Sequence, residues 1–123
     1  IGLSTNKSKR IETLSIPNKY MPDFLRGHID GDGSFLVYND KVYPNAERLY
    51  TLFSSASLKH LYWIRDAITS LYNIIGKLRN CTRAWQLVYS KKNSIILLNK
   101  IYYNKNVPCL ARKRNLIKKY LVN

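Results

Sequence analysis

The sequence predicts an α+β domain in which a four-stranded antiparallel sheet carries all of its helices on one face. The chain has 123 residues, of which 46% are hydrophobic, and this is enough for one domain with a core. Segments with helical periodicity alternate with short runs of strand character. The predicted order is helix, hairpin, helix, hairpin, helix, helix, so two hairpins are available to form one sheet.

The first 22 residues are polar and contain Pro17 and Pro22. We interpret residues 1–22 as a lead-in or linker segment and residues 23–123 as the domain. The first helix is then expected after Pro22, with Asp23 as its N-cap and apolar residues at helical spacing.

The first hairpin is expected after this helix, where the apolar period changes from helical to alternating. Residues 34–38 and 49–53 have strand composition, and Asn-Asp and Pro-Asn dipeptides between them favour a turn. Ser57 is placed to cap the second helix. The apolar face of that helix consists of Leu61, Ile64, Ile68 and Leu71.

A second hairpin is predicted from residues 74–81 and 85–89. A third helix follows, and residues 104–108 end it because they are rich in asparagine and contain proline. The apolar residues of the third helix are Ile95, Leu98, Ile101 and Tyr102, and those of a last, basic helix are Leu110, Leu116, Ile117 and Leu121. Trp63 and Trp85 are expected at the edge of the core, and His60 at the surface or in a helix cap.

The charge of the chain indicates a polyanionic partner. Lysine and arginine total 21 against 7 acidic residues, which gives a net charge of +14. Nucleic acid fits this balance best because neutralising phosphates releases counterions. An anionic membrane surface is the alternative, but no basic helix with a clean apolar face and no run long enough to cross a bilayer is evident.

The two cysteines, Cys81 and Cys109, lie far apart without metal-ligand spacing, and we interpret them as small buried residues in a reducing compartment. Lysine, asparagine, isoleucine and tyrosine are used heavily, which is typical of AT-rich genomes. We therefore expect an intracellular location, in a mitochondrion, a chloroplast or the cytoplasm of an AT-rich microbe.

The segment from Leu25 to Gly33, with the sequence LRGHIDGDG, is the most informative in the chain. Gly27 and Gly31 are four residues apart and therefore share one face of a helix, which lets a second helix approach closely. The acids that follow would end this helix and present carboxylates there. One interpretation of the Asp-Gly-Asp-Gly run is a plain structural turn. An EF-hand calcium loop is excluded because Phe35 and Lys41 stand where it needs glycine and glutamate.

In the third interpretation, the run is part of a longer motif, because the nine residues resemble the LAGLIDADG motif of homing endonucleases. They match its leucine, glycine, isoleucine, aspartate and final glycine positions, while Arg26 and His28 depart from it. We expect Arg26 on the solvent side of the helix. The order of elements is similar to the αββαββα half-domain of that family, which has a saddle-shaped sheet. Residues 108–114 resemble its segment that brings a lysine to the active site, and residues 1–18 resemble the joining stretch of two-motif members.

The resemblance implies a site-specific double-strand DNA endonuclease that hydrolyses phosphodiesters with a divalent cation, Mg²⁺ or another such as Mn²⁺ or Ca²⁺. By this comparison Asp32, placed just past the helix end, binds the metal, and a carbonyl of Gly31 or Gly33 adds a ligand. Lys113 is the catalytic lysine, with Arg112 the next candidate. A single acid suffices because Mg²⁺ keeps several waters and takes substrate phosphate oxygens.

A single motif implies a partner, either a second copy in a homodimer or the first half of a longer chain. The interface then consists of Leu25, Gly27, His28 and Gly31. Double-stranded DNA is expected along the free face of the sheet, although the facing of the second strand stays open because Leu52 shares the side of Arg48, Tyr50 and Ser54. The predicted DNA-binding residues are Ser34, Tyr38, Arg48, Tyr50, Lys77, Arg79, Arg83, Gln86 and Arg112.

Two other functions compatible with the sequence are non-catalytic. One is a nucleic-acid binder on the same fold, either an intron RNA maturase or a DNA-binding regulator. The other is a small basic ribosomal or ribonucleoprotein component, which predicts a monomer in solution.

Overall fold

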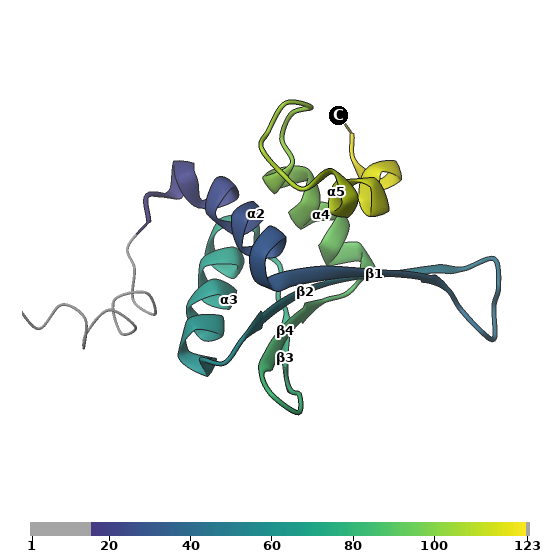
Figure 1. Ribbon diagram of the computed structural model, residues 1–123, viewed down its shortest axis with the longest axis horizontal. Helices are drawn as coiled ribbons and strands as arrows, with labels where there is room; N and C mark the ends of the chain where they lie inside the picture. The colour runs from purple at the N-terminus through teal and green to yellow at the C-terminus, as the bar shows by residue number, and fades with distance from the viewer. Residues whose placement is uncertain (1–15, 123) are drawn as a thin grey trace, which may run out of the picture.

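The computed structural model describes residues 16–122, so most of the predicted lead-in lies outside the described residues. It confirms the α+β class and the predicted order of elements (Figure 1). The helices are α2 (Met21–Asp32), α3 (Leu58–Tyr72), α4 (Lys91–Ile101) and α5 (Ala111–Ile117), with 3-10 turns η1 (Asn18–Tyr20) and η2 (Lys118–Tyr120). The strands are β1 (Gly33–Asn39), β2 (Glu47–Ser55), β3 (Lys77–Asn80) and β4 (Trp85–Tyr89).

The four strands form one antiparallel sheet in the order β1-β2-β4-β3. Phe35 lies opposite Thr51, and Thr51 lies opposite Tyr89, so these three side chains share one face. Helices cover this face, and the other face is open, as predicted (Figure 1). The sheet is strongly twisted, so the long β1–β2 hairpin and the short β3–β4 hairpin point in different directions.

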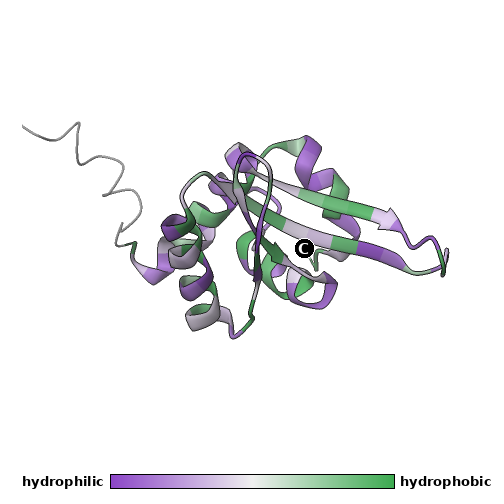
Figure 2. Cartoon of the chain, turned by 90° about the horizontal axis from the view of Figure 1, so that it is seen from below, coloured by the Kyte–Doolittle hydropathy of each residue, from purple (hydrophilic) through white to green (hydrophobic). Residues whose placement is uncertain are grey.

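The core lies between the covered face of the sheet and the helices. Leu25 and Ile29 of α2 pack there, and both are fully buried. Hydrophobic and hydrophilic positions are interleaved along the strands, as one buried face requires (Figure 2). Trp63 and Trp85 are half-buried against the core, which confirms their predicted place at its edge. The other fully buried core residues include Leu49, Phe53, Leu61, Ile64, Ile68, Leu87, Leu97, Leu98 and Ile101.

A buried polar contact joins α4 to the sheet. The Thr51 hydroxyl donates to Ser94 Oγ at 2.9 Å, and Ser94 Oγ donates to the Tyr89 carbonyl, also at 2.9 Å. Both side chains are fully buried, so the contact satisfies groups that would otherwise be desolvated without a partner.

Helix α2 differs from its prediction at both ends. It begins at Met21, so Tyr20 is the N-cap, and Asp23 lies inside the first turn. It continues through Gly31 to Asp32 and ends at Gly33, so the Asp-Gly-Asp run does not break the helix. Asp32 is therefore its last residue rather than a residue beyond it. Helical φ and ψ are open to glycine, and the core contacts of Leu25 and Ile29 outweigh its low helix propensity.

Other boundaries agree more closely with prediction. The Ser57 side chain caps α3 by accepting from the His60 N–H, as expected. The second hairpin has a shorter first strand than predicted, because β3 starts only at Lys77. The last helix is also shorter, since the chain tightens into η2 after Ile117.

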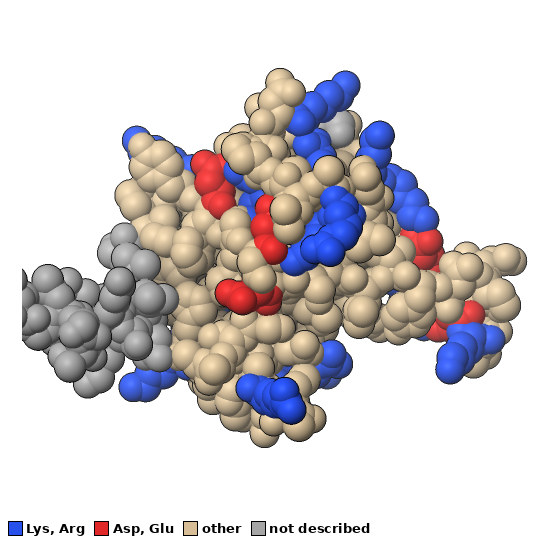
Figure 3. All heavy atoms as spheres, viewed as in Figure 1, with Lys and Arg blue, Asp and Glu red and all other residues tan. Residues whose placement is uncertain are grey.

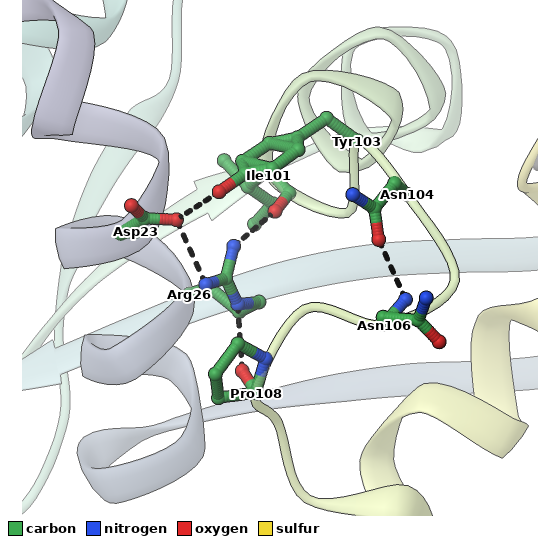
Figure 4. Close-up of polar contacts among 7 residues, drawn as sticks. All are labelled: Asp23, Arg26, Ile101, Tyr103, Asn104, Asn106 and Pro108. Atoms are coloured by element: carbon green, nitrogen blue, oxygen red, sulfur yellow. Dashed lines mark hydrogen bonds and ion pairs between the residues drawn. The ribbon is translucent and has the colours of Figure 1, made fainter.

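Arg26 is buried, contrary to the expectation that it faces solvent (Figure 4). Its guanidinium donates to the carbonyls of Ile101 and Pro108, both at 2.7 Å, and pairs with Asp23 at 2.8 Å. Asp23 also accepts from the Tyr103 hydroxyl at 2.7 Å. The Tyr103 hydroxyl and the Arg26 guanidinium lower the pKa of Asp23. The network ties α2 to the segment that follows α4.

Candidate functional site

The carboxyl end of α2 presents two acids in different environments. Asp32 is exposed at the last position of the helix. Asp30 is half-buried, and its Oδ2 accepts from the N–H of Leu110 at 3.0 Å. Its Oδ1 is buried and has no hydrogen-bond partner among the described residues. The two residues are about 200° apart around the helix, so one carboxylate holds the start of α5 while the other faces solvent.

Lys113, on α5, caps the same end of α2 with its side chain. Its Nζ donates to the carbonyls of Ile29 at 2.6 Å, Asp30 at 3.1 Å and Gly33 at 2.7 Å. An ammonium group is favourable at a helix C-terminus, where carbonyls lack helical partners and the dipole is negative. The structure thus places the predicted catalytic lysine at this site, with its three donors bound to main-chain oxygens. Asp30 and Lys113 together clamp α2 to α5.

The glycines of the motif divide into two kinds. Gly27 and Gly31 are exposed, and a Cβ built on either meets no other described atom within 4 Å. A Cβ on Gly33 would lie 2.7 Å from both Ile29 Cα and the Leu52 carbonyl oxygen. Gly33 is therefore needed for the close approach of helix and sheet, whereas Gly27 and Gly31 leave a shallow face open to solvent.

Two of the predicted interface residues do not lie on this glycine face. Leu25 is fully buried in the core of its own chain. His28 turns toward α3 and stacks on His60, with ring centroids 5.1 Å apart. The reason is helical geometry, because residues 25 and 28 are about 160° and 100° from residue 27 around the axis. The exposed interface candidates are therefore Gly27 and Gly31 alone.

His28 and His60 form a close imidazole pair beneath the end of α2. Their Nε2 atoms are 3.1 Å apart, and the rings of Phe24, Phe53 and Trp63 surround them. Burial and the neighbouring His60 ring lower the pKa of His28, and the carboxylate of Asp32 opposes this shift. The pair is a contact between α2 and α3. Of the two places expected for His60, the surface is wrong because the side chain is buried, whereas its N–H does take part in the Ser57 cap of α3.

The open face of the sheet carries the predicted polar set. Strand alternation and the register place Ser34, Leu52 and Val88 in one row across it. This settles the facing of β2, so Leu52 lies on the same face as Arg48, Tyr50 and Ser54. A hollow of about 260 Å³ lies on this face. Its lining consists of Leu36, Tyr38, Tyr50, Leu52, Arg79 and Val88.

Hydrogen bonds order several side chains on the open face. Arg79 Nε donates to Gln86 Oε1 at 2.9 Å, and Gln86 Nε2 donates to Ser54 Oγ at 3.4 Å. Arg48 pairs with Asp40 at 2.7 Å, next to the hairpin turn. Main-chain N–H groups and Arg48 lower the pKa of Asp40, and Asp40 raises the pKa of Arg48. These side chains are thus positioned before any ligand is bound.

Two predicted DNA contacts lie elsewhere. Arg83 is in the turn between β3 and β4, and Arg112 is exposed on α5, one residue from Lys113. Lys77 is exposed at the start of β3 and shares the open face with Arg79. Figure 3 shows acidic side chains gathered along α2, with basic side chains beside them and over the C-terminal helices.

The end of α2 offers oxygen donors of the kind that Mg²⁺ prefers. Among residues 16–122 no group of three or more histidine, cysteine or acidic side chains could hold a metal ion. Asp32 supplies one exposed carboxylate, and the Gly31 carbonyl lies in the last turn of the helix, where helical partners run out. The Gly33 carbonyl is taken by Lys113. The donor set fits a hard cation in chemistry and is incomplete within one chain.

Three contacts of this region escaped sequence reasoning. The Asp23–Arg26 pair has i,i+3 spacing, which is a signal for an ion pair on a helix. The Asp30–Leu110 and His28–His60 contacts span 80 and 32 residues and carry no local signal.

No helix among the described residues is both long and apolar enough to cross a membrane.

Comparison with known proteins gives structural matches and no sequence matches. A scan of family models finds no match, and a search of curated proteins finds none either. Among solved structures, the LAGLIDADG meganuclease I-AabMI, bound to uncleaved DNA, matches with a TM-score of 0.56 and 22% identity. This match covers 80% of the present chain and 34% of that chain, so the chain spans about a third of that meganuclease.

Two further structures agree with this match. The homing endonuclease I-TnaI matches with a TM-score of 0.52 and 19% identity, over 80% of this chain and 67% of that one. The homing endonuclease I-CvuI, in complex with its target in the presence of Ca, matches with a TM-score of 0.56 and 17% identity. That match covers 82% of this chain and 63% of the other. The described part of the chain therefore has the fold of the LAGLIDADG homing endonucleases.

Proposed function

We propose that this chain is one unit of a paired, site-specific DNA endonuclease that hydrolyses phosphodiesters with a divalent cation, Mg²⁺ in the first instance. The observation that carries the proposal is the arrangement of α2. Its exposed glycine face, formed by Gly27 and Gly31, ends at the exposed carboxylate of Asp32. A helix that packs on this face brings a second acid close to the first.

Pairing follows from the shape of the glycine face. A helix can approach a surface without side chains more closely than one that carries them, so backbone and flanking residues gain contact area. Phe24 is half-buried at the edge of this face, and pairing would remove more of its apolar surface from water. The partner is a second copy or another half-domain on a longer chain. The match to about a third of I-AabMI is compatible with either.

The roles of the residues follow from their positions. Asp32 would hold the cation together with the Gly31 carbonyl, water and a phosphate oxygen of DNA. The cation would supply a more acidic bound water and neutralise charge on the phosphate. Asp30 and Lys113 would act as positioning residues, because they fix the end of α2 and so the backbone that carries Asp32. Lys113 also adds positive potential beside the phosphate.

DNA would lie along the open face. This face carries Lys77, Arg79 and Arg48 as cations and Gln86 as a side chain that both donates and accepts. Such side chains can grip phosphates or contact base edges in the major groove. The hydrogen bonds among them reduce the entropy that binding would otherwise cost.

The test begins with the target, which is selected from random duplexes by binding in Ca²⁺. Cleavage of the enriched DNA is then measured in Mg²⁺ for the wild type, Asp32→Asn and Asp66→Asn. Asp66 is a matched control because it is an exposed acid on α3.

We expect Asp32→Asn to retain binding and lose at least about a hundredfold in cleavage rate. Asp66→Asn should cleave as the wild type does. Equal cleavage by Asp32→Asn, or binding by the wild type without cleavage of any enriched DNA, would refute the proposal.

A further inference from the structure

We propose that the chain has a second nucleic-acid-binding surface, a basic groove on the helical side of the sheet that takes a single-stranded polynucleotide. The groove lies between the segment that follows α4 and the α5–η2 region. It is separate from the open face and from the end of α2, so the inference does not depend on the proposed endonuclease.

The groove consists of two adjoining hollows. The first has a volume of about 340 Å³ and is lined by Lys105, Arg114, Asn115 and Lys118. The second has a volume of about 700 Å³ and is lined by Val37, Asn115, Leu116, Lys118 and Lys119. Asn115 and Lys118 line both, so the two hollows adjoin. Two adjoining hollows offer room for several backbone units rather than for a single isolated anion.

The cations of the groove are available to a ligand. Among the described residues, neither the Lys105 nor the Lys118 ammonium makes a hydrogen bond or an ion pair. Arg114 is held in place by its bonds to the carbonyls of Lys105, at 2.7 Å, and Asn104, at 3.3 Å. Lys119 is paired with Glu47, and no acid lines either hollow. Two unpaired ammonium groups beside a fixed guanidinium therefore give a local positive potential that favours phosphates.

Strand β1 separates this groove from the open face. Val37 lines the groove, whereas its neighbours Leu36 and Tyr38 line the hollow on the open face. Successive side chains of a strand point to opposite sides of the sheet, so the two surfaces face in opposite directions. The basic side chains over the C-terminal helices in Figure 3 belong to this other side of the molecule. One straight duplex cannot contact both surfaces.

The composition of the groove favours a single strand over a duplex. Leu116 is 49% exposed, and together with Val37 it gives the second hollow apolar lining beside Lys118 and Lys119. A single strand can turn its bases onto such a lining while its phosphates contact the lysines. A duplex keeps its bases stacked inside and presents a convex ridge of phosphates, which leaves Leu116 and Val37 without a partner.

The test compares two double variants with the wild type by fluorescence anisotropy, in Ca²⁺ and without Mg²⁺. Lys105→Ala/Lys118→Ala removes the free cations of the groove, and Lys77→Ala/Arg79→Ala removes two from the open face. The probes are labelled oligouridylate, labelled oligothymidylate, a labelled duplex, and vesicles containing phosphatidylserine. Circular dichroism and thermal melting confirm that each variant is folded.

We expect the groove variant to lose about tenfold in affinity for a single strand and to bind the duplex like the wild type. Its slope of log affinity against log salt should become shallower by about 1.4, since two phosphate contacts are lost from a single strand. The open-face variant should show the reverse preference. Comparison of the two oligonucleotides distinguishes RNA from DNA as the preferred strand. Equal effects of both variants on both ligands, no effect of the groove variant, or a loss confined to vesicle binding would overturn the proposal.

Discussion

The two faces of α2 use the same helix for different purposes. One face carries Leu25 and Ile29, which are fully buried in the chain's own core. The other carries Gly27 and Gly31, which contribute no packing within the chain. The buried face explains why the helix forms and where it sits. The exposed face has no such explanation within one chain, because glycine weakens a helix interior unless something requires its small size.

The charged residues Arg26 and Asp32 of α2 show the same contrast between a buried and an exposed position. Arg26 is buried, and its guanidinium donates to two carbonyls and the Asp23 carboxylate of its own chain, so its role is structural. Asp32, six residues later, is exposed at the helix end. A charge that folding satisfies internally supports the fold, whereas a charge left exposed beside a bare helix face is available for chemistry.

The largest expected effect is on the buried side. Replacing Arg26 with methionine, Arg26→Met, should lower the free energy of unfolding by about 3 kcal/mol, because the carbonyls of Ile101 and Pro108 lose their donors. Urea denaturation measures this. The matched control is Arg48→Met, which also breaks an arginine–aspartate pair, but at a side chain 48% exposed instead of 5%. A loss of less than about 1 kcal/mol is expected there. Equal losses would show that burial does not distinguish the two pairs.

Gly33→Ala sharpens the comparison among the glycines. The new Cβ would meet two backbone atoms, Ile29 Cα and the Leu52 carbonyl oxygen, at 2.7 Å, and neither can move without displacing α2 from the sheet. We expect a loss of about 2 kcal/mol in the free energy of unfolding. Thermal denaturation monitored by circular dichroism measures it. A variant as stable as the wild type would mean that the approach of helix and sheet is looser than described.

Gly27→Ala should have the opposite sign in dilute, unpaired protein. The added methyl group meets no other described atom within 4 Å, and alanine favours the helix by about 1 kcal/mol over glycine. The same methyl group should weaken the proposed pairing. Sedimentation equilibrium should therefore show a higher dimer dissociation constant in a variant that melts at a higher temperature. Unchanged self-association would indicate that this face is not the pairing surface.

The smallest effect concerns pH. Burial and His60 lower the pKa of His28 below its ordinary value of 6.5, so the folded state binds this proton less readily than the unfolded state. Stability is then greatest above pH 6.5, falls as the pH drops below it, and levels off below the folded-state pKa. We expect urea denaturation to show this decrease between pH 8 and pH 5. His28→Phe, which keeps the aromatic contacts with Phe24 and Phe53, should reduce this dependence. If the free energy of unfolding of His28→Phe depends on pH as that of the wild type does, groups other than His28 cause the dependence.

Sequence reasoning succeeded where the signal was local. Ser57 as a cap, the bounds of β4 and the polar set on the open face all follow from period, turn chemistry and strand alternation. It was wrong about Arg26 and about the side of α2 on which Leu25 and His28 lie. Arg26 looked like a surface residue because its partners, the carbonyls of Ile101 and Pro108, are 75 and 82 residues away.

The sequence by itself determined the class of fold, the order of its elements and the motif that sets Asp32 beside two glycines. These depend on neighbours within a few residues, where backbone preference and apolar period act directly. The tertiary structure alone decided that Asp30 and Lys113 clamp α2 to α5, that His28 meets His60, and that a basic groove lies behind β1. Those contacts join residues distant in the chain, and the packing of the helices on the sheet is what brings them together.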